Sequence, residues 1–226
     1  RQGLTGRAGA AVRILAIDTA ANLCAACVFD TQAGELGRHV LDLGKGHAEH
    51  LMGVIAAALE KAGSTYADLE AIAVSVGPGS FTGVRVGVAT ARGLALALNI
   101  PALGVTTLEA LAAEARESAL GSPVIVRIEA GRGQAYVAGF SADGTQTLSP
   151  AALSIEEADR LTDEAGTQTL VVSGKSTADI LAYARIAANT LERNPGEIPE
   201  RPRPLYLRDA DAKPQGSFAL PRKTAS

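Results

Sequence analysis

The chain has 226 residues, of which 47% are hydrophobic and 20% are charged, a composition that excludes intrinsic disorder. The formal net charge of −3 excludes a protein that grips nucleic acid by bulk positive charge. No run of 18 apolar residues occurs, so we expect no membrane-spanning helix. Two cysteines are too few for a disulfide framework, and with no secretion signal we expect a cytoplasmic protein.

The first part of the chain predicts a strand meander followed by alternating helices and strands. Residues 1–12 are interpreted as a leader or tag remnant, and 13–109 as the first subdomain. Strands are expected over 13–19, 23–30, 35–43, 71–76 and 102–105, and helices over 47–62, over 81–98 and from Thr106 or Thr107 to Ser118. This order resembles the ribonuclease-H-like half of the actin, sugar-kinase and heat-shock ATPase superfold.

The second part repeats this order in abbreviated form over 110–193. Strands are expected over 124–129, 134–141, 145–148 and 169–173, and helices over 155–165 and 178–189. Residues 194–226 are interpreted as an extended Pro-rich tail. The predicted fold is therefore α/β and actin-like, with two ribonuclease-H-like subdomains whose mixed sheets are flanked by helices.

The most specific string runs from Gly77 to Gly83, Gly-Pro-Gly-Ser-Phe-Thr-Gly, between a buried strand and a helix that Ser80 can cap. Free backbone N–H groups and the helix dipole at such a turn can hold a phosphate. The other interpretation is a turn without a ligand, whose glycines allow close packing. The candidate nucleotide or phosphate contacts are Asp18, Thr19, Gly77, Gly79 and Ser80.

Three further patterns are interpreted as structural. Cys24 and Cys27 lie on a predicted strand with their side chains on opposite faces, which suits buried hydrophobic residues better than a redox pair. His47 and His50 are interpreted as partly exposed residues at a helix start. Gly174-Lys-Ser176 lacks the first glycine of a phosphate loop, because Thr169 stands in its place.

Five motifs together resemble the bacterial TsaB family. They are Ile17-Asp-Thr19, Gly46-His-Ala-Glu-His-Leu51, Gly77-Pro-Gly-Ser-Phe-Thr-Gly-Val-Arg85, Gly104-Val-Thr-Thr-Leu108 and Pro204-Leu-Tyr-Leu-Arg208. The resemblance covers about residues 13–214. Within it, Glu129-Ala-Gly-Arg-Gly133 departs from the family, which usually has Asp first and Arg third.

The resemblance implies a non-catalytic dimerization subunit in the synthesis of threonylcarbamoyladenosine in tRNA. Its partners would be a catalytic paralogue, TsaD, and an ATPase subunit, TsaE, with tRNA contacted at most indirectly and no membrane involved. No intrinsic cofactor or metal is expected, although ATP or ADP could sit at the partner interface. The paralogue carries two metal-binding histidines where this chain has Thr107 and Leu111, so metal-dependent transfer is not expected.

The two long helices also carry small or apolar residues on the side opposite their predicted core face. These residues are Met52, Ala56, Val86, Thr90 and Ala97. Such a face indicates a partner surface, and by resemblance it would pair with TsaD or, when the chain is alone, with a second copy. The alternative function is a small ATP-binding enzyme of the same superfold, using Asp18 and the Gly77–Gly83 turn.

Overall fold

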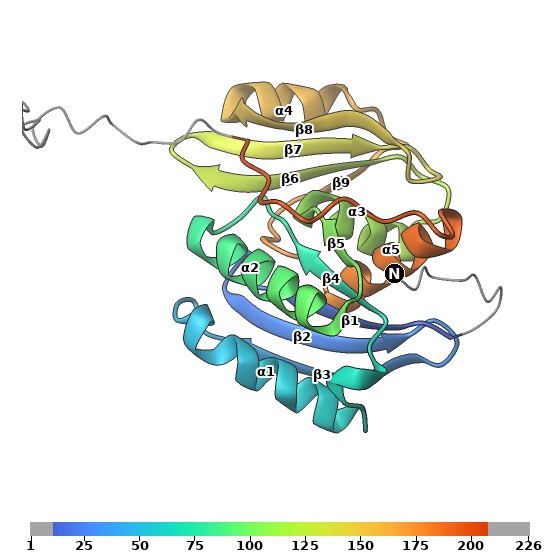
Figure 1. The fold of residues 1–226 in the computed structure, drawn as a ribbon. Coiled ribbons are helices and arrows are strands. Elements are labelled where there is room, and N and C mark those ends of the chain that lie inside the picture. Colours follow the sequence, from blue (N-terminus) through green and yellow to red (C-terminus); the bar gives the residue numbers. More distant parts are fainter. Residues whose placement is uncertain (1–10, 208–226) are drawn as a thin grey trace, which may run out of the picture.

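The computed structural model describes residues 11–207, which form two mixed sheets and three layers of helices (Figure 1). From one side to the other, the layers are α1 and α2, the first sheet, α3 and α5, the second sheet, and α4. Apolar side chains fill each of the four spaces between these layers.

The first sheet has the strand order β3-β2-β1-β4-β5. Its first three strands form the predicted antiparallel meander, and β4 and β5 join β1 in parallel through helical crossovers. The elements are β1 (Arg13–Asp18), β2 (Leu23–Asp30), β3 (Gly34–Asp42), α1 (His47–Lys61), a 3-10 turn (Tyr66–Asp68), β4 (Ala71–Ser75), α2 (Phe81–Leu98) and β5 (Ala102–Val105). This is the ribonuclease-H-like order that the sequence predicts.

The second sheet has the order β8-β7-β6-β9, a shortened version of the same arrangement. Its elements are β6 (Val124–Gly131), β7 (Gln134–Phe140), β8 (Gln146–Ser154), α4 (Ile155–Glu164) and β9 (Leu170–Val172). Strand β8 runs six residues beyond the predicted end at 148 and contains Pro150. Pro150 lies at the irregularity between Leu148 and Ala151, where it has no partner on β7, so its missing N–H costs no ladder hydrogen bond.

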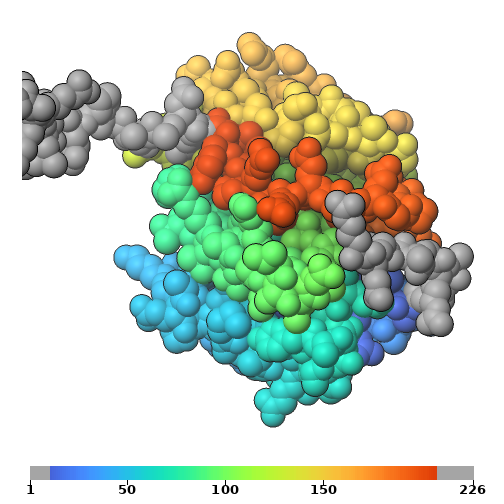
Figure 2. Space-filling view, viewed as in Figure 1, coloured from blue at the N-terminus to red at the C-terminus, as the bar shows by residue number. Residues whose placement is uncertain are grey.

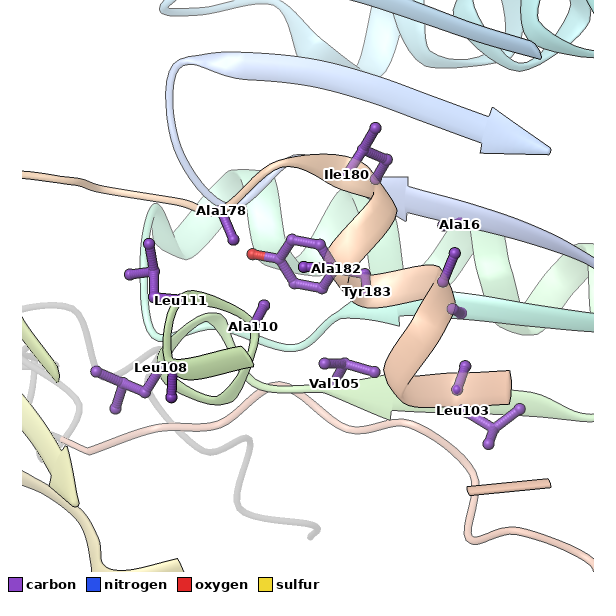
Figure 3. Close-up of a cluster of buried hydrophobic side chains, with 14 of the residues drawn as sticks. Ala16, Leu103, Val105, Leu108, Ala110, Leu111, Ala178, Ile180, Ala182 and Tyr183 are labelled. Atoms are coloured by element: carbon purple, nitrogen blue, oxygen red, sulfur yellow. The ribbon is translucent and has the colours of Figure 1, made fainter. Parts of the chain in front are cut away.

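The two central helices each pack against the sheet of the other half of the chain. Helix α3 (Thr107–Ser118) follows the first sheet but contacts β6, β7 and β9, and α5 (Ile180–Arg193) follows the second sheet but contacts β1 and β2. Figure 3 shows the shared core, in which Tyr183 of α5 lies near Leu111 and Ala110 of α3. A division of the chain after residue 109 stays a prediction, but its 110–193 part does not pack as one unit.

The core is built mainly from small and branched residues. Cys27 faces the space between the two sheets and Cys24 faces α1 and α2, so the two cysteines lie on opposite faces of β2, as predicted. Burial raises the pKa of the Cys24 thiol to about 11 and that of Cys27 to about 12. Both thiols are therefore protonated and unreactive at neutral pH.

The predicted start of the fold at residue 13 is one residue late. The N–H of Val12 donates to Thr31 Oγ1 at 2.9 Å, and Val12 O accepts from the Thr31 N–H at 3.1 Å. Val12 also packs against the core between the sheets. Residues 1–10 of the expected leader and residues 208–226 of the expected tail lie outside the described residues.

Within residues 11–207, only α2 is long and apolar enough to cross a membrane by length and composition. The sequence did not predict this, because Arg85 and Arg92 interrupt its apolar run. Its inward residues, which include Val84, Val88 and Ala91, are buried against the first sheet. We interpret α2 as a core helix with an apolar outer side.

Candidate functional site

A crevice opens between the two halves of the molecule and encloses a cavity of about 1070 Å³. It is lined by the β1–β2 turn (20–22), the turn before α2 (78–80), the first residues of α2, the β6–β7 hairpin (128–130) and the extended segment 205–207. Ligands of α/β proteins commonly bind beyond the carboxyl ends of parallel strands, and β1 and β4 end here.

A C-terminal strap, residues 202–207, crosses this crevice. Figure 2 shows the segment wedged between the two halves. The N–H of Leu205 donates to Val76 O at 2.8 Å, and Pro202 lies over Gly104, where an added Cβ would be 3.3 Å from Pro202 Cβ. The strap thus follows the ends of β4 and β5 and closes one side of the crevice.

The glycines of the Gly77–Gly83 turn are required by contact with the end of β1. A Cβ on Gly79 would lie 2.1 Å from Ala20 O, and a Cβ on Gly83 would lie 2.0 Å from Thr19 O. The Ser80 N–H donates to Ala20 O at 2.6 Å, and Ser80 Oγ caps α2 by accepting from the Gly83 N–H at 3.2 Å. Close packing therefore accounts for both glycines.

Asp18 lies in the interior, at the centre of a polar network that joins the two halves of the chain. Its carboxylate accepts from Thr177 Oγ1 at 2.6 Å and from the Ala20 N–H at 2.9 Å, and Thr177 Oγ1 is 2.8 Å from the Tyr183 hydroxyl. Loss of solvation by burial raises the pKa of Asp18, although the hydrogen bonds from Thr177 and Ala20 oppose the rise. Its side chain does not line the cavity.

Of the five predicted phosphate contacts, only Gly79 and Ser80 line the cavity. Thr19 is buried like Asp18, and its hydroxyl donates to Gly83 O at 2.7 Å. Gly77 is buried too, and its carbonyl oxygen accepts from the Thr107 N–H at 2.8 Å. The structure thus uses Asp18, Thr19 and Gly77 to hold elements together.

The position of the paralogue's metal ligands is part of the core in this chain. Thr107 is fully buried with its Oγ1 3.3 Å from Ser75 Oγ, and Leu111, one turn later on α3, is also buried. Among the described residues, no group of three or more His, Cys, Asp or Glu side chains lies close enough to hold a metal ion. In this chain, the position therefore contributes to packing.

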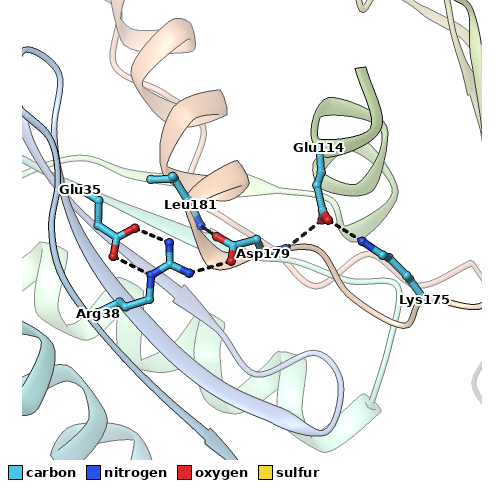
Figure 4. A network of polar contacts seen from close by, with 6 residues as sticks. All are labelled: Glu35, Arg38, Glu114, Lys175, Asp179 and Leu181. Carbon is cyan, nitrogen blue, oxygen red and sulfur yellow. Dashed lines mark hydrogen bonds and ion pairs between the residues drawn. The ribbon is translucent and has the colours of Figure 1, made fainter. Parts of the chain in front are cut away.

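Lys175 of the Gly-Lys-Ser string belongs to a surface network (Figure 4). Its Nζ donates to Glu114 of α3, and the other oxygen of Glu114 accepts from the Asp179 N–H at 3.0 Å. Asp179 caps α5 through the Leu181 N–H and accepts from Arg38, which also pairs with Glu35 on β3. The lysine therefore anchors the loop before α5, in agreement with its interpretation as structural.

One of the histidine interpretations is wrong. His50 is exposed as expected, but His47 is only 7% exposed, because the start of α1 turns it inward. Its Nε2 has no hydrogen-bond partner among the described residues. His47 lies near enough to Asp18 for its charge to favour the ionised carboxylate.

Helices α1 and α2 lie side by side on the first sheet and share an outer face with few charges (Figure 1). Of the predicted partner residues, Met52, Ala56 and Ala97 are exposed. The other two, Val86 and Thr90, are half-buried. Between His50 and Glu60, α1 carries no charged residue. Gly53 and Gly93 also lie on this face, and an added Cβ at either would meet nothing within 4 Å.

Sequence reasoning missed a cluster at the mouth of the crevice. The Arg85 guanidinium carbon lies 3.6 Å from the Phe81 ring centroid and 5.5 Å from that of Tyr206, and Arg85 Nε donates to the Tyr206 hydroxyl at 2.8 Å. Arg85 and Tyr206 are 121 positions apart, so no local pattern could have joined them.

These features together define the class of protein. The strand order of the first sheet, its shortened repeat and the crevice between the halves are those of the actin-like fold. A solved structure from Pseudomonas aeruginosa, described as an uncharacterized protein with similarity to the peptidase YeaZ, matches with a TM-score of 0.72 and 26% identity. That match covers 87% of this chain and all of the other chain.

Sequence comparison identifies the family. The profile of TsaD, tRNA N6-adenosine threonylcarbamoyltransferase, matches residues 42–193. The Escherichia coli tRNA threonylcarbamoyladenosine biosynthesis protein TsaB is 35% identical over 58% of this chain, and an uncharacterized protein of Mycobacterium tuberculosis is 34% identical over 89%. The match covers 56% of the E. coli protein and 94% of the mycobacterial one. The chain belongs to the TsaB family, within the superfamily that the TsaD profile describes.

Proposed function

We propose that this chain is a non-catalytic subunit of the machinery that makes threonylcarbamoyladenosine in tRNA. In this proposal, the chain binds and orders a TsaD-like catalytic subunit in the cytoplasm. A TsaE-like ATPase would join the complex, and tRNA would be contacted at most indirectly. The support from the comparisons is the naming of TsaB relatives for this biosynthesis, over about half of their length.

The observation that carries the proposal is the outer face of α1 and α2. Glycine inside a helix costs about 1 kcal/mol relative to alanine, and nothing within this chain requires it at positions 53 or 93. A face of glycine and alanine, with Met52 beside it, lets another helix pair approach closely. The proposed partner therefore covers this face with helices of its own, and a second copy of the chain takes that place when the partner is absent.

The absence of catalysis in the proposal follows from the position of Thr107 and Leu111. Leu111 has no donor atom, and the Thr107 hydroxyl is buried against Ser75 Oγ, so this position provides no pair of metal ligands. ATP or ADP, if it is present in the complex, would then act at the boundary with the partner rather than on Asp18, which lies within the protein.

The test is co-purification of this chain with the TsaD of the same organism. Met52→Glu and Ala97→Glu each place a charge on the proposed face, where both residues are exposed and the fold should tolerate the change. Leu120→Glu is the matched control, because Leu120 is 88% exposed on the loop after α3. We expect the complex with the wild type and the control, and at least a tenfold loss of affinity with the two face variants.

Two other results would contradict parts of the proposal. If no complex forms with the wild type, with or without nucleotide, the subunit role is wrong. If the complex forms and survives both face variants, the role stands and the contact lies on another surface. Circular dichroism of every variant, taken alone, separates loss of binding from loss of folding.

A further inference from the structure

Arg85 is held in one orientation at the mouth of the crevice. Its guanidinium stacks on Phe81 at 3.6 Å and is fixed from the other side by the bond from Nε to the Tyr206 hydroxyl. The two rings lie 5.7 Å apart and are tilted by 44°, so they flank the guanidinium rather than enclose it. Phe81 is 54% exposed and Tyr206 is 51% exposed, so the cluster faces solvent.

The two Nη groups of Arg85 have no partner among residues 11–207, although Nε is used. A guanidinium whose plane is fixed and whose Nη donors are open has the geometry that binds an oxyanion through two parallel hydrogen bonds. Since the side chain is already ordered by the aromatic rings, a ligand would not have to order it.

The remainder of the cavity is mostly apolar. Val84 and Leu205 line the side of the first sheet, and Ile128 and Tyr136 line the side of the second. Glu129 of the β6–β7 hairpin also lines it and provides a carboxylate away from α2. The lining therefore suits a ligand with an anionic end, an apolar or aromatic body, and a hydrogen-bond donor.

We propose that this crevice is a binding site for a small molecule carrying a phosphate or a carboxylate. The oxyanion lies on the Nη groups of Arg85, the apolar body lies between Phe81 and the second sheet, and a donor on the ligand faces Glu129. This proposal does not depend on the proposed partner face, although Arg85 directly precedes Val86 of that face on α2. The cavity does not reach the predicted phosphate contacts Asp18, Thr19 and Gly77, although Gly79 and Ser80 line it.

The alternative is that the cluster only fastens the strap to α2. Shortening Tyr206 would destabilise the protein whichever role is right, so a measurement of protein stability does not distinguish the two roles. Binding of a ligand does, because a purely structural cluster has no reason to discriminate between charged and uncharged molecules.

The probes are phenyl phosphate, benzoate and uncharged benzyl alcohol, titrated into the ¹⁵N-labelled full chain and followed by amide chemical shifts. We expect saturable shifts at residues 79–85 with at least one anion and none with the alcohol. The tighter of the two anions identifies the ligand as a phosphate or a carboxylate compound. No saturable shift with either anion, or equal binding of the alcohol, would overturn the proposal.

Three variants locate the anion. Arg85→Lys keeps the charge but removes the fork, and we expect at least tenfold weaker binding, whereas Arg92→Lys on the same helix should change nothing. Tyr206→Phe keeps the ring but frees Nε, and a threefold loss is expected. Glu129→Gln should tighten binding of these donor-free anions, because it removes a negative charge from the cavity. Unchanged affinity in Arg85→Lys, with thermal melting confirming the fold, would refute the assignment.

Discussion

At the scale of single residues, the most informative group is Asp18, because the sequence indicates a phosphate contact and the structure gives it hydrogen bonds within the protein. Its carboxylate accepts hydrogen bonds from Thr177 Oγ1 and the Ala20 N–H, and His47 lies near it, but burial removes more solvation than these groups replace. The ionised form must therefore be held in a poorly solvated site, and this is why its pKa is raised.

The raised pKa predicts a pH-dependent stability. An unfolded Asp titrates near pH 3.8, so between that pH and the folded-state pKa the folded chain binds more protons than the unfolded chain. The contribution of Asp18 to stability is thus fully present below about pH 3.8 and is lost as the pH rises through the folded-state pKa. Each tenfold increase in proton affinity on folding costs about 1.4 kcal/mol at higher pH.

Asp18→Asn tests this. The amide stays neutral, its oxygen can accept from Ala20, and its nitrogen can donate to Thr177 Oγ1, which then donates to Tyr183. We expect the variant to be more stable than the wild type at pH 8 and to lose the fall in stability above pH 4, as measured by urea unfolding across that range. Asp18→Ala should be about 1–3 kcal/mol less stable than Asp18→Asn at every pH, because both side chains are neutral and only the amide keeps the hydrogen bonds. Parallel curves for the wild type and Asp18→Asn would contradict the argument.

At the scale of elements, the glycines on the two sides of α2 differ in whether an added side chain would fit. Gly83 lies against the backbone of Thr19, which cannot move without displacing the end of β1. Gly93 points away from the sheet, with nothing within 4 Å of an added Cβ. The same substitution should therefore have opposite effects at the two positions.

We expect Gly83→Ala to cost about 3 kcal/mol or more, because a methyl group would overlap a fixed carbonyl oxygen. Gly93→Ala should stabilise the monomer by about 1 kcal/mol, measured at a dilution where the proposed second copy has dissociated, since alanine is the better helix former. Guanidinium unfolding of both variants measures the difference. A destabilised Gly93→Ala would show that this face is already covered in the isolated chain.

The elements also show how far sequence reasoning reaches. Periodicity, caps and turn glycines are local signals, so the helices and strands appear near their predicted positions, including the caps Ser80 and Thr106. The position of α5 on the first sheet has no local signal, because its apolar face would suit either sheet. The same holds for contacts over long separations, such as Thr177 with Asp18 and Tyr206 with Arg85.

The sequence likewise indicates some features of the candidate site and not others. Met52 and Ala56 are exposed, as the helical periodicity indicates, and their place in a partner interface stays a prediction. A phosphate contact at Asp18 and Thr19 requires accessible side chains, but both are buried, because the loop before α5 packs beyond the end of the strand. The crevice and its strap arise only when both halves of the chain are assembled.

At the scale of the whole molecule, the exchange of α3 and α5 makes the two halves dependent on each other. Without α5, the first sheet would expose the face that carries Ile14, Ala16 and Cys27, and without α3 the second would expose Val124 and Val126. A predicted boundary after residue 109 would suggest two units that unfold separately. The shared core instead predicts a single cooperative transition.

Leu111→Ala decides between these behaviours. Leu111 is buried on α3 within the core that both sheets share, so its truncation should cost about 2–5 kcal/mol. If the halves are coupled, native-state hydrogen exchange will show the same loss of protection in β2 of the first sheet and β7 of the second. If they fold independently, protection will fall in β7 alone, because α3 packs mainly on the second sheet.

Ala158 of α4, in the outer core beyond the second sheet, offers the matched control. Ala158→Gly should act first on the second sheet, and it will lower protection in β2 only if the two sheets unfold as one unit.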